Sequence, residues 1–242
     1  MKVLDALLES RTPLSLEQIC AYTDLPKSTA FRVTVNLLQG QYLTETEEGY
    51  WLGLKMLRFG ALVEESLDLT QQARPFLLQL RDQANETIHL AVLDDDLRVV
   101  YLDKLPTQQA VGLMKSRIGS TAPMHGTALG KAMAAFRPED EISQWVRTVG
   151  LRALTEITIT DEDTLLQELG EIRSRGYAVD NGEFETSVRC VAAPIRDRTG
   201  SVIAAVSISG PGSRMPVPLI GSSMAMQVVE TARHISHALG YS

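Results

Sequence analysis

Hydrophobic and polar residues repeat with a helical period near the start of the chain, most clearly in residues 26–39. Apolar side chains recur there every three or four positions, which predicts a helix with one face directed into a core. This predicted face consists of Phe31, Val33, Val35, Leu37 and Leu38. Pro26 suits the first helical turn because its missing N–H would be unpaired there, and Gly40 ends the helix.

The opposite face of the predicted helix is polar and carries Lys27, Ser28, Thr29, Arg32 and Asn36. These side chains offer hydrogen-bond donors of the kind that bind phosphate oxygens and the base edges of DNA. Taken alone, such a helix is more often an ordinary amphipathic surface helix. The neighbouring elements therefore decide whether it is interpreted as a DNA-reading helix.

Two further helices and a hairpin are predicted around it. Residues 3–8 form the first helix, and Ser15 with Gln18 three residues later forms a capping box for the second. A strand, turn and return strand follow at 42–53. Three helices and a hairpin in about sixty residues predict a winged helix-turn-helix domain over residues 1–64, whose second motif helix enters the DNA major groove.

The pattern changes after this domain. Residues 65–84 have apolar positions at helical spacing and are predicted to form a linker helix. From residue 87 the period becomes two, and Asp94–Asp96 marks a hairpin turn. Strands and helices then follow one another through residues 85–242, which predicts an α+β domain with an antiparallel sheet flanked by helices. The further strands are expected at 110–115, 177–181, 190–196 and 202–209, and the helices at 127–136, 138–149, 162–175 and 218–239.

Length and composition fit a soluble protein of two domains. The 242 residues are 44% hydrophobic and 22% charged. No apolar run approaches the roughly 18 residues of a membrane helix, and no signal peptide is recognisable. Cys20 and Cys190 fall in different predicted domains, so we expect no disulfide and a cytoplasmic location.

The net charge of −7 is unusual for a DNA-binding protein. Residues 1–60 hold six Lys or Arg against seven Asp or Glu, yet Lys27 and Arg32 are the only charged residues between 25 and 44. The predicted reading face is therefore locally basic. Three glutamates in the hairpin make its contact with the DNA backbone doubtful. They are Glu45, Glu47 and Glu48.

Three stretches together resemble IclR-type transcriptional regulators. Residues 15–53 resemble the reading helix and wing of that family. Two further stretches resemble its effector domain: residues 175–211 and residues 117–135, RIGSTAPMHGTALGKAMAA. The resemblance implies a ligand-responsive regulator, more often a repressor of a catabolic operon, with a GAF-like effector domain. It also implies operator DNA as partner and a homodimer or a dimer of dimers. We expect no cofactor, metal or membrane partner.

The resemblance further implies an effector pocket, and a small organic acid is the expected ligand. Serines two apart share one face of a strand, and a helix start after His125 favours anions. The matched positions hold no Lys or Arg, which also suits a neutral ligand. The matched positions are Val111, Met114, Ala122, Ala128, Leu129, Asp180, Val188, Cys190, Ser207 and Ser209.

Other interpretations remain open from the sequence. Cys190, His125 and Asp180 are the ingredients of a thiol hydrolase, although no nucleophile elbow, Walker loop, dinucleotide fingerprint or zinc signature is present. A ligand-binding module that has lost DNA binding is a third possibility, because of the acidic hairpin. The Asp94–Asp96 triplet, and His234 with His237, are more simply a turn and a surface pair than metal ligands.

Overall fold

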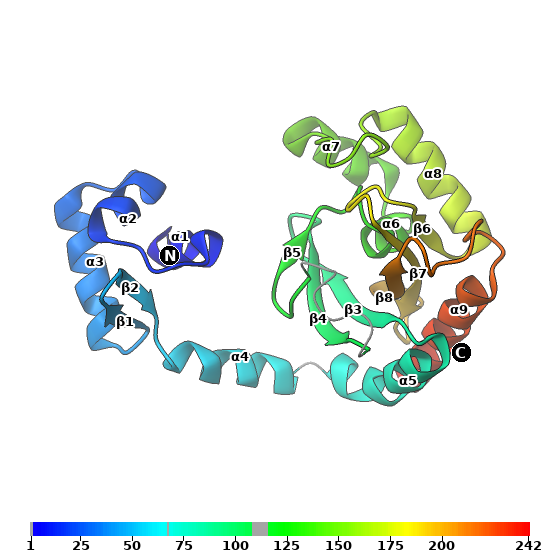
Figure 1. Ribbon diagram of the computed structural model, residues 1–242, viewed down its shortest axis with the longest axis horizontal. Helices are drawn as coiled ribbons and strands as arrows, with labels where there is room; N and C mark the ends of the chain where they lie inside the picture. Colours follow the sequence, from blue (N-terminus) through cyan, green and yellow to red (C-terminus); the bar gives the residue numbers. More distant parts are fainter. Residues whose placement is uncertain (1, 67, 108–115) are drawn as a thin grey trace. The chain divides into compact units, whose positions relative to one another are not determined.

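The computed structural model describes residues 2–66, 68–107 and 116–242. The chain divides into two compact units, residues 1–68 and residues 69–242. Each unit has its own hydrophobic core. Figure 1 shows the elements of both units in chain order.

The first unit is a winged helix-turn-helix, as predicted. Its core contains Val3, Leu7, Ile19, Ala30 and Leu43. The backbone of Leu14 pairs with that of Tyr50, which attaches the hairpin to the helices. The elements are α1 (Lys2–Ser10), α2 (Leu16–Thr23), α3 (Lys27–Gln39), β1 (Leu43–Thr46), β2 (Gly49–Leu52) and α4 (Lys55–Ser66).

The capping box at α2 is confirmed. The Ser15 hydroxyl accepts a hydrogen bond from the Gln18 N–H, and the Gln18 side chain accepts one from the Ser15 N–H at 2.8 Å. Pro26 is the N-cap of α3, and Gly40 follows the last helical residue. The ends of the two motif helices therefore follow from local sequence signals.

The inward face of α3 differs from the prediction at Phe31. The Phe31 side chain is 52% exposed, whereas Ala30 and Thr34 are fully buried. The small side chains at 30 and 34 allow α3 to approach its neighbours closely, so the buried face is centred away from Phe31. The prediction that Phe31 belongs to the core is wrong, because apolar character alone does not determine which side of a helix faces the core.

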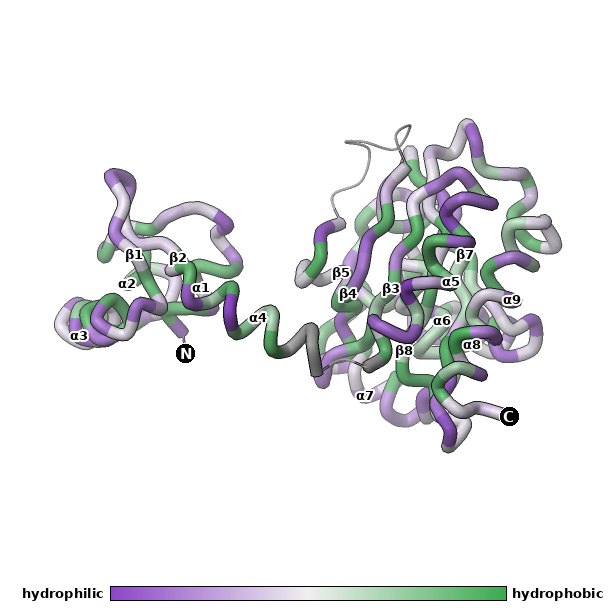
Figure 2. Tube along the Cα trace, turned by 90° about the horizontal axis from the view of Figure 1, so that it is seen from below, coloured by the Kyte–Doolittle hydropathy of each residue, from purple (hydrophilic) through white to green (hydrophobic). Residues whose placement is uncertain are grey.

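Gly49 is required where the hairpin meets the helices. Its φ of +135° is unfavourable for any other residue. A Cβ atom there would lie 2.6 Å from the carbonyl carbon of Leu14. The tip of the hairpin, residues 45–48, is hydrophilic and exposed (Figure 2).

The second unit contains one antiparallel sheet in the order β5-β4-β3-β8-β7-β6. Strand β8 lies in the middle and pairs with β3 on one side and β7 on the other. The expected strand at 110–115 lies outside the described residues. The strands are β3 (Thr87–Leu93), β4 (Val99–Leu105), β5 (Thr121–Ala122), β6 (Ala178–Asp180), β7 (Val188–Arg196) and β8 (Val202–Pro211).

Helices α5 (Asp68–Ala84) and α9 (Ser223–Ala238) cover one face of this sheet. Leu77 and Leu80 of α5 are fully buried in the same core as strands β3 and β8. The helix expected to be a linker over 65–84 is therefore packed into the second unit. Helix α9 begins later than expected because Ser222 caps it, accepting a hydrogen bond from the Ala225 N–H.

On the other face of the sheet α6 (Ala128–Ala134) packs against the strands, α8 (Glu162–Arg175) packs on α6 and α7 (Glu139–Val149) packs on α8. The sequence predicted all three helices closely. Asp161 caps α8, and Thr127 caps α6. Because helices cover both faces, side chains on both faces of the central strands are buried (Figure 1). None of the helices among the described residues has the length and apolar character needed to cross a membrane.

Candidate functional site

The polar face of α3 is exposed in the first unit. The side chains of Lys27, Ser28, Arg32 and Asn36 are exposed, and that of Thr29 is half-buried. Lys27 Nζ lies 3.3 Å from Glu17 Oε1, but both side chains are exposed, so this pair is weak. The five residues predicted to contact DNA therefore lie on the accessible part of the motif's second helix.

A second candidate site lies on the sheet face beneath α6. Strand register places Asp180 opposite Cys190, and Cys190 opposite Ser209. In the adjacent row Ser207 lies opposite His89. Directly paired residues share one face of a sheet, so the register gathers these five side chains on the α6 side.

These side chains line a cavity on that face of the sheet. Seven of the ten positions implied by the resemblance lie there: Ala128, Leu129, Asp180, Val188, Cys190, Ser207 and Ser209. Ala122 instead pairs with Val99 and packs in the neighbouring core. Val111 and Met114 lie outside the described residues.

Six further residues that line the cavity were not predicted from the sequence. His89 occupies a polar position of the period-two pattern, which normally faces solvent. It is buried because α6 covers that face. The hydrophobic pattern carries no signal for the cavity residues that lie in loops. The polar strand residues are buried because helices cover both faces of the sheet. The six are His89, Tyr101, Ser116, Thr127, Phe184 and Glu185.

The polar groups of the cavity are largely uncharged. His89 Nε2 lies 2.9 Å from Ser116 Oγ, and the hydroxyls of Ser207 and Ser209 are 3.3 Å apart. Burial, with the positive charge of Lys104, lowers the pKa of His89 to about 3, so its imidazole is neutral at pH 7. Among the described residues that line the cavity there is no Lys or Arg. The side chains that line the cavity therefore offer hydrogen bonds rather than a fixed positive charge.

The arrangement does not suit a thiol hydrolase. Burial, reinforced by Asp180, raises the pKa of the Cys190 thiol, which disfavours the nucleophilic thiolate. His125 does not line the cavity, and its Nε2 lies 3.0 Å from the Arg152 carbonyl oxygen. Cys190 and Asp180 therefore line the cavity together, but His125, the base that a thiol hydrolase would need, does not.

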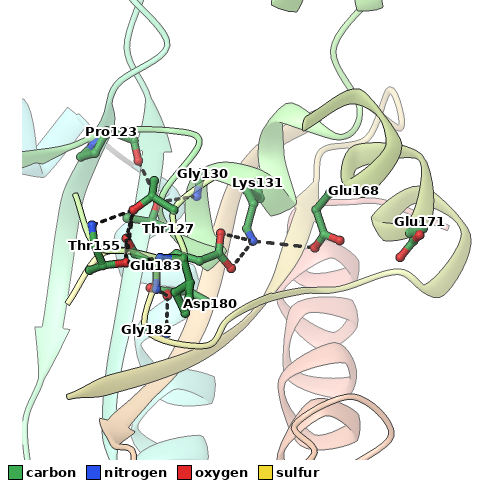
Figure 3. A network of polar contacts seen from close by, with 12 residues as sticks. Pro123, Thr127, Gly130, Lys131, Thr155, Glu168, Glu171, Asp180, Gly182 and Glu183 are labelled. Carbon is green, nitrogen blue, oxygen red and sulfur yellow. Dashed lines mark hydrogen bonds and ion pairs between the residues drawn. The ribbon is translucent and has the colours of Figure 1, made fainter. Parts of the chain in front are cut away.

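Asp180 belongs to a buried polar network at the edge of the cavity (Figure 3). Its Oδ1 accepts hydrogen bonds from the N–H groups of Gly182 at 3.0 Å and Glu183 at 2.6 Å. Lys131 Nζ, on α6, binds both carboxylate oxygens of Glu183 at 2.7 Å. Glu168, on α8, lies 3.7 Å from Lys131. The network joins α6, α8 and the loop after β6, so it holds one edge of the cavity.

Burial, and then the charge of Glu183, raises the pKa of Asp180 to about 7. In the unfolded chain the pKa of an aspartate is near 3.8, so the folded state binds the proton of Asp180 more tightly. Asp180 therefore favours folding at low pH. This contribution is lost as the pH rises through 7.

We expect the free energy of unfolding of the wild type to fall, relative to Asp180→Asn, by about 2 kcal/mol between pH 5 and pH 7. Asparagine mimics the protonated carboxyl and accepts the same two N–H bonds. Urea denaturation of both proteins at half-unit pH steps measures the difference. A difference that does not vary with pH would show that Asp180 is ionised throughout.

Two features that suggested metal binding have simpler roles. Asp94 Oδ1 accepts hydrogen bonds from the N–H groups of Asp96 and Arg98, as expected of a turn. His234 lies beside Phe76, with ring centroids 6.0 Å apart. Within residues 2–66, 68–107 and 116–242, no three His, Cys, Asp or Glu side chains gather as metal ligands.

Comparison with known proteins connects both sites to one family. The family model described as "Bacterial transcriptional regulator IclR C-terminal" matches residues 61–237, and "IclR helix-turn-helix domain" matches residues 1–47. The chain is 36% identical to the HTH-type transcriptional regulator KdgR of Escherichia coli over 241 residues, which cover 99% of this chain and 90% of KdgR.

Two other relatives carry further information. The chain is 34% identical to the HTH-type transcriptional repressor AllR of E. coli, covering 98% of this chain and 88% of AllR. A crystal structure of an IclR homologue from Microbacterium hydrocarbonoxydans, complexed with 4-hydroxybenzoate, is 27% identical, with a TM-score of 0.82, over 98% of this chain and 96% of that one. With a helix-turn-helix and a separate effector domain, and with regulators rather than enzymes as relatives, this chain belongs to the IclR family of ligand-responsive, DNA-binding transcriptional regulators.

Proposed function

We propose that this chain is a cytoplasmic, homodimeric repressor of a catabolic operon that responds to a small organic acid. The observation that carries the proposal is the cavity lined by hydroxyl groups, in a unit separate from the exposed polar face of α3. The five polar residues of α3 would contact the operator. Effector binding would favour one of two arrangements of the paired DNA-binding units through its different affinity for them.

The chemistry of the cavity supports an organic acid with additional polar groups. The hydroxyls of Ser116, Ser207 and Ser209 can each donate a hydrogen bond to a ligand oxygen once the ligand replaces their bonds to His89 and to one another. A protonated Asp180 adds a fourth donor near neutral pH. Val188 and Phe184 supply an apolar wall. The 4-hydroxybenzoate of the Microbacterium relative is an acid that also carries a hydroxyl group.

Helix α4 supports pairing of the DNA-binding units. Leu57, Phe59 and Leu62 are all exposed along it, and Leu54 is exposed just before it. A unit of this size buries a modest core alone, so covering these side chains with a second copy would add buried apolar surface. Two copies of α3 would then reach successive major grooves of a near-palindromic operator. A repressor is favoured because AllR, a relative over nearly the whole chain, is named as one.

We expect Arg32→Ala to weaken binding to the operator about 10- to 100-fold while leaving effector affinity unchanged. Arg32 is exposed on α3, and a guanidinium bound to guanine or phosphate contributes roughly 1–3 kcal/mol. Fluorescence anisotropy with the region upstream of the gene, against a scrambled duplex and across a salt series, measures the change.

Arg11→Asn is the matched control for this experiment. Arg11 is exposed in the same unit, and its φ of +56° suits asparagine, so the variant removes one positive charge without strain. Its operator affinity should stay within about threefold of the wild type, as expected for one distant charge. Equal losses in both variants would mean that only net charge matters. No preference for the upstream duplex in the wild type would favour a sensor without DNA binding.

A further inference from the structure

The exposed aromatic ring on α3 has no role in the function described so far. Phe31 is 52% exposed and is not a member of the first unit's core cluster. The buried face of α3 is completed by Ala30 and Thr34, with Val33 and Leu37 partly buried beside them. The core of the unit therefore does not require a large aromatic side chain at position 31.

Phe31 lies at the edge of the polar face of α3, on the side of Lys27 and Ser28. It follows Ser28 by three residues and Lys27 by four, and Arg32 is the next residue. Residues three and four apart on a helix are surface neighbours. Phe31 is thus a surface neighbour of Lys27 and Ser28, which we propose contact phosphates and base edges, so its exposed ring lies beside the groove that they enter.

The chemistry of a phenyl ring limits what it can recognise in a major groove. It has no donor or acceptor, so it cannot bind a phosphate or the hydrogen-bonding edge of a base. The thymine C5-methyl group is the apolar feature that the major groove displays, and phenylalanine is among the residues that contact it. A buried methyl group also releases water from the ring, which gives the contact a favourable free energy.

We propose that Phe31 reads a thymine through its C5-methyl group and so fixes a T·A pair in each half-site of the operator. This inference rests on the proposed function of α3 as the reading helix. Lys27 and Arg32 would supply salt-dependent contacts on either side. Phe31 would supply sequence preference without a charge, which suits a domain with few basic residues.

The test compares thymine with uracil, which lacks the methyl group but keeps the same base pairing. The duplex is selected by the wild-type protein from a random pool and then prepared with thymidine or with deoxyuridine. We expect the wild-type dimer to bind the uracil duplex about 5- to 20-fold more weakly, because each of two half-sites loses one methyl contact. Phe31→Ala should lose a similar factor on the thymine duplex and bind the two duplexes equally.

Two further variants make the result specific to Phe31. Arg32→Ala should bind both duplexes weakly but keep the wild-type ratio between them, and its salt dependence should be less steep. Phe31→Leu keeps an apolar side chain at little risk to the fold and should retain part of the thymine preference. The salt dependence of Phe31→Ala should equal that of the wild type.

Two outcomes would overturn the inference in distinguishable ways. If Phe31→Ala keeps the full preference for thymine, or binds the selected duplex as tightly as the wild type, Phe31 does not read the methyl group although α3 reads DNA. If selection by the wild type enriches no sequence, both this inference and the proposed reading role of α3 fail.

Discussion

Glu183→Ala is expected to lower the free energy of unfolding of the second unit by about 3–5 kcal/mol. The side chain of Lys131 is only 1% exposed, and Glu183 binds its ammonium group through both carboxylate oxygens. Removing the carboxylate leaves a buried positive charge whose remaining nearby partner, Glu168, is 3.7 Å away and already bound to Arg175. An uncompensated buried charge is among the most destabilising defects a single substitution can create.

Denaturation must be followed in the second unit alone, because a chain of two units need not unfold in one step. The chain has two tryptophans, Trp51 in the first unit and Trp145 in the second. In a Trp51→Phe background, the fluorescence of Trp145 during urea denaturation therefore reports the second unit.

Two control variants separate charge burial from other effects. Lys131→Met combined with Glu183→Leu removes both charges and should recover most of the lost stability, since apolar residues of similar size often replace a buried pair without cost. Arg173→Ala removes the exposed ion pair with Glu139 and should cost less than about 1 kcal/mol. A loss below about 1 kcal/mol in Glu183→Ala would show that Lys131 reaches water or another carboxylate and is not left as an uncompensated buried charge.

Gly130→Ala is expected to destabilise the second unit by about 2–3 kcal/mol. An alanine usually stabilises a helix by about 1 kcal/mol relative to glycine, so the expected sign is the reverse of the ordinary one. A Cβ atom at position 130 would lie 2.6 Å from the Cα and 2.8 Å from the carbonyl carbon of Met124, and it would also overlap the carbonyl oxygen. Backbone cannot move aside as a flexible side chain can, so α6 must shift.

The shift would also change the cavity, because Ala128 and Leu129 of the same helix form part of its wall. We therefore expect ligand affinity to fall together with stability, measured by calorimetric titration with an organic acid that binds the wild type. Gly170→Ala is the matched control, since a Cβ atom there meets nothing within 4 Å. It should stabilise α8 by about 0.5–1 kcal/mol. Equal effects of the two substitutions would show that α6 packs more loosely than the structure indicates.

Local signals in the sequence predicted the elements well where they were self-contained. Ser15 and Gln18 defined the start of α2, and Asp161 the start of α8, because capping depends on residues within one turn. The strand positions of Ser207 and Ser209 were predictable for the same reason, since alternation along a strand is fixed by the backbone. Helix α9 was predicted from residue 218 but begins at Ser223. Local signals are less reliable there because prolines and glycines are frequent in the preceding residues.

Features that depend on distant partners could not be predicted. Lys131 reads as an ordinary charged helix residue, and its burial depends on Glu183, 52 residues later. His89 reads as a solvent-facing strand residue, and only the helix packed above it makes it a cavity residue. Phe31 reads as a core residue, and the small side chains of Ala30 and Thr34 displace it to the surface. In each case tertiary packing overrides a local pattern.

The position of β8 between β3 and β7 has a consequence for synthesis of the chain. Without β8, strands β3, β4 and β5 form one fragment and β6 with β7 another, with no pairing between them. The ribosome must therefore complete residues 202–211 before the sheet exists and the cavity can form. Domains generally fold as units, the N-terminal one first. The DNA-binding unit of each nascent chain is thus able to fold about 140 residues before its own ligand site is complete.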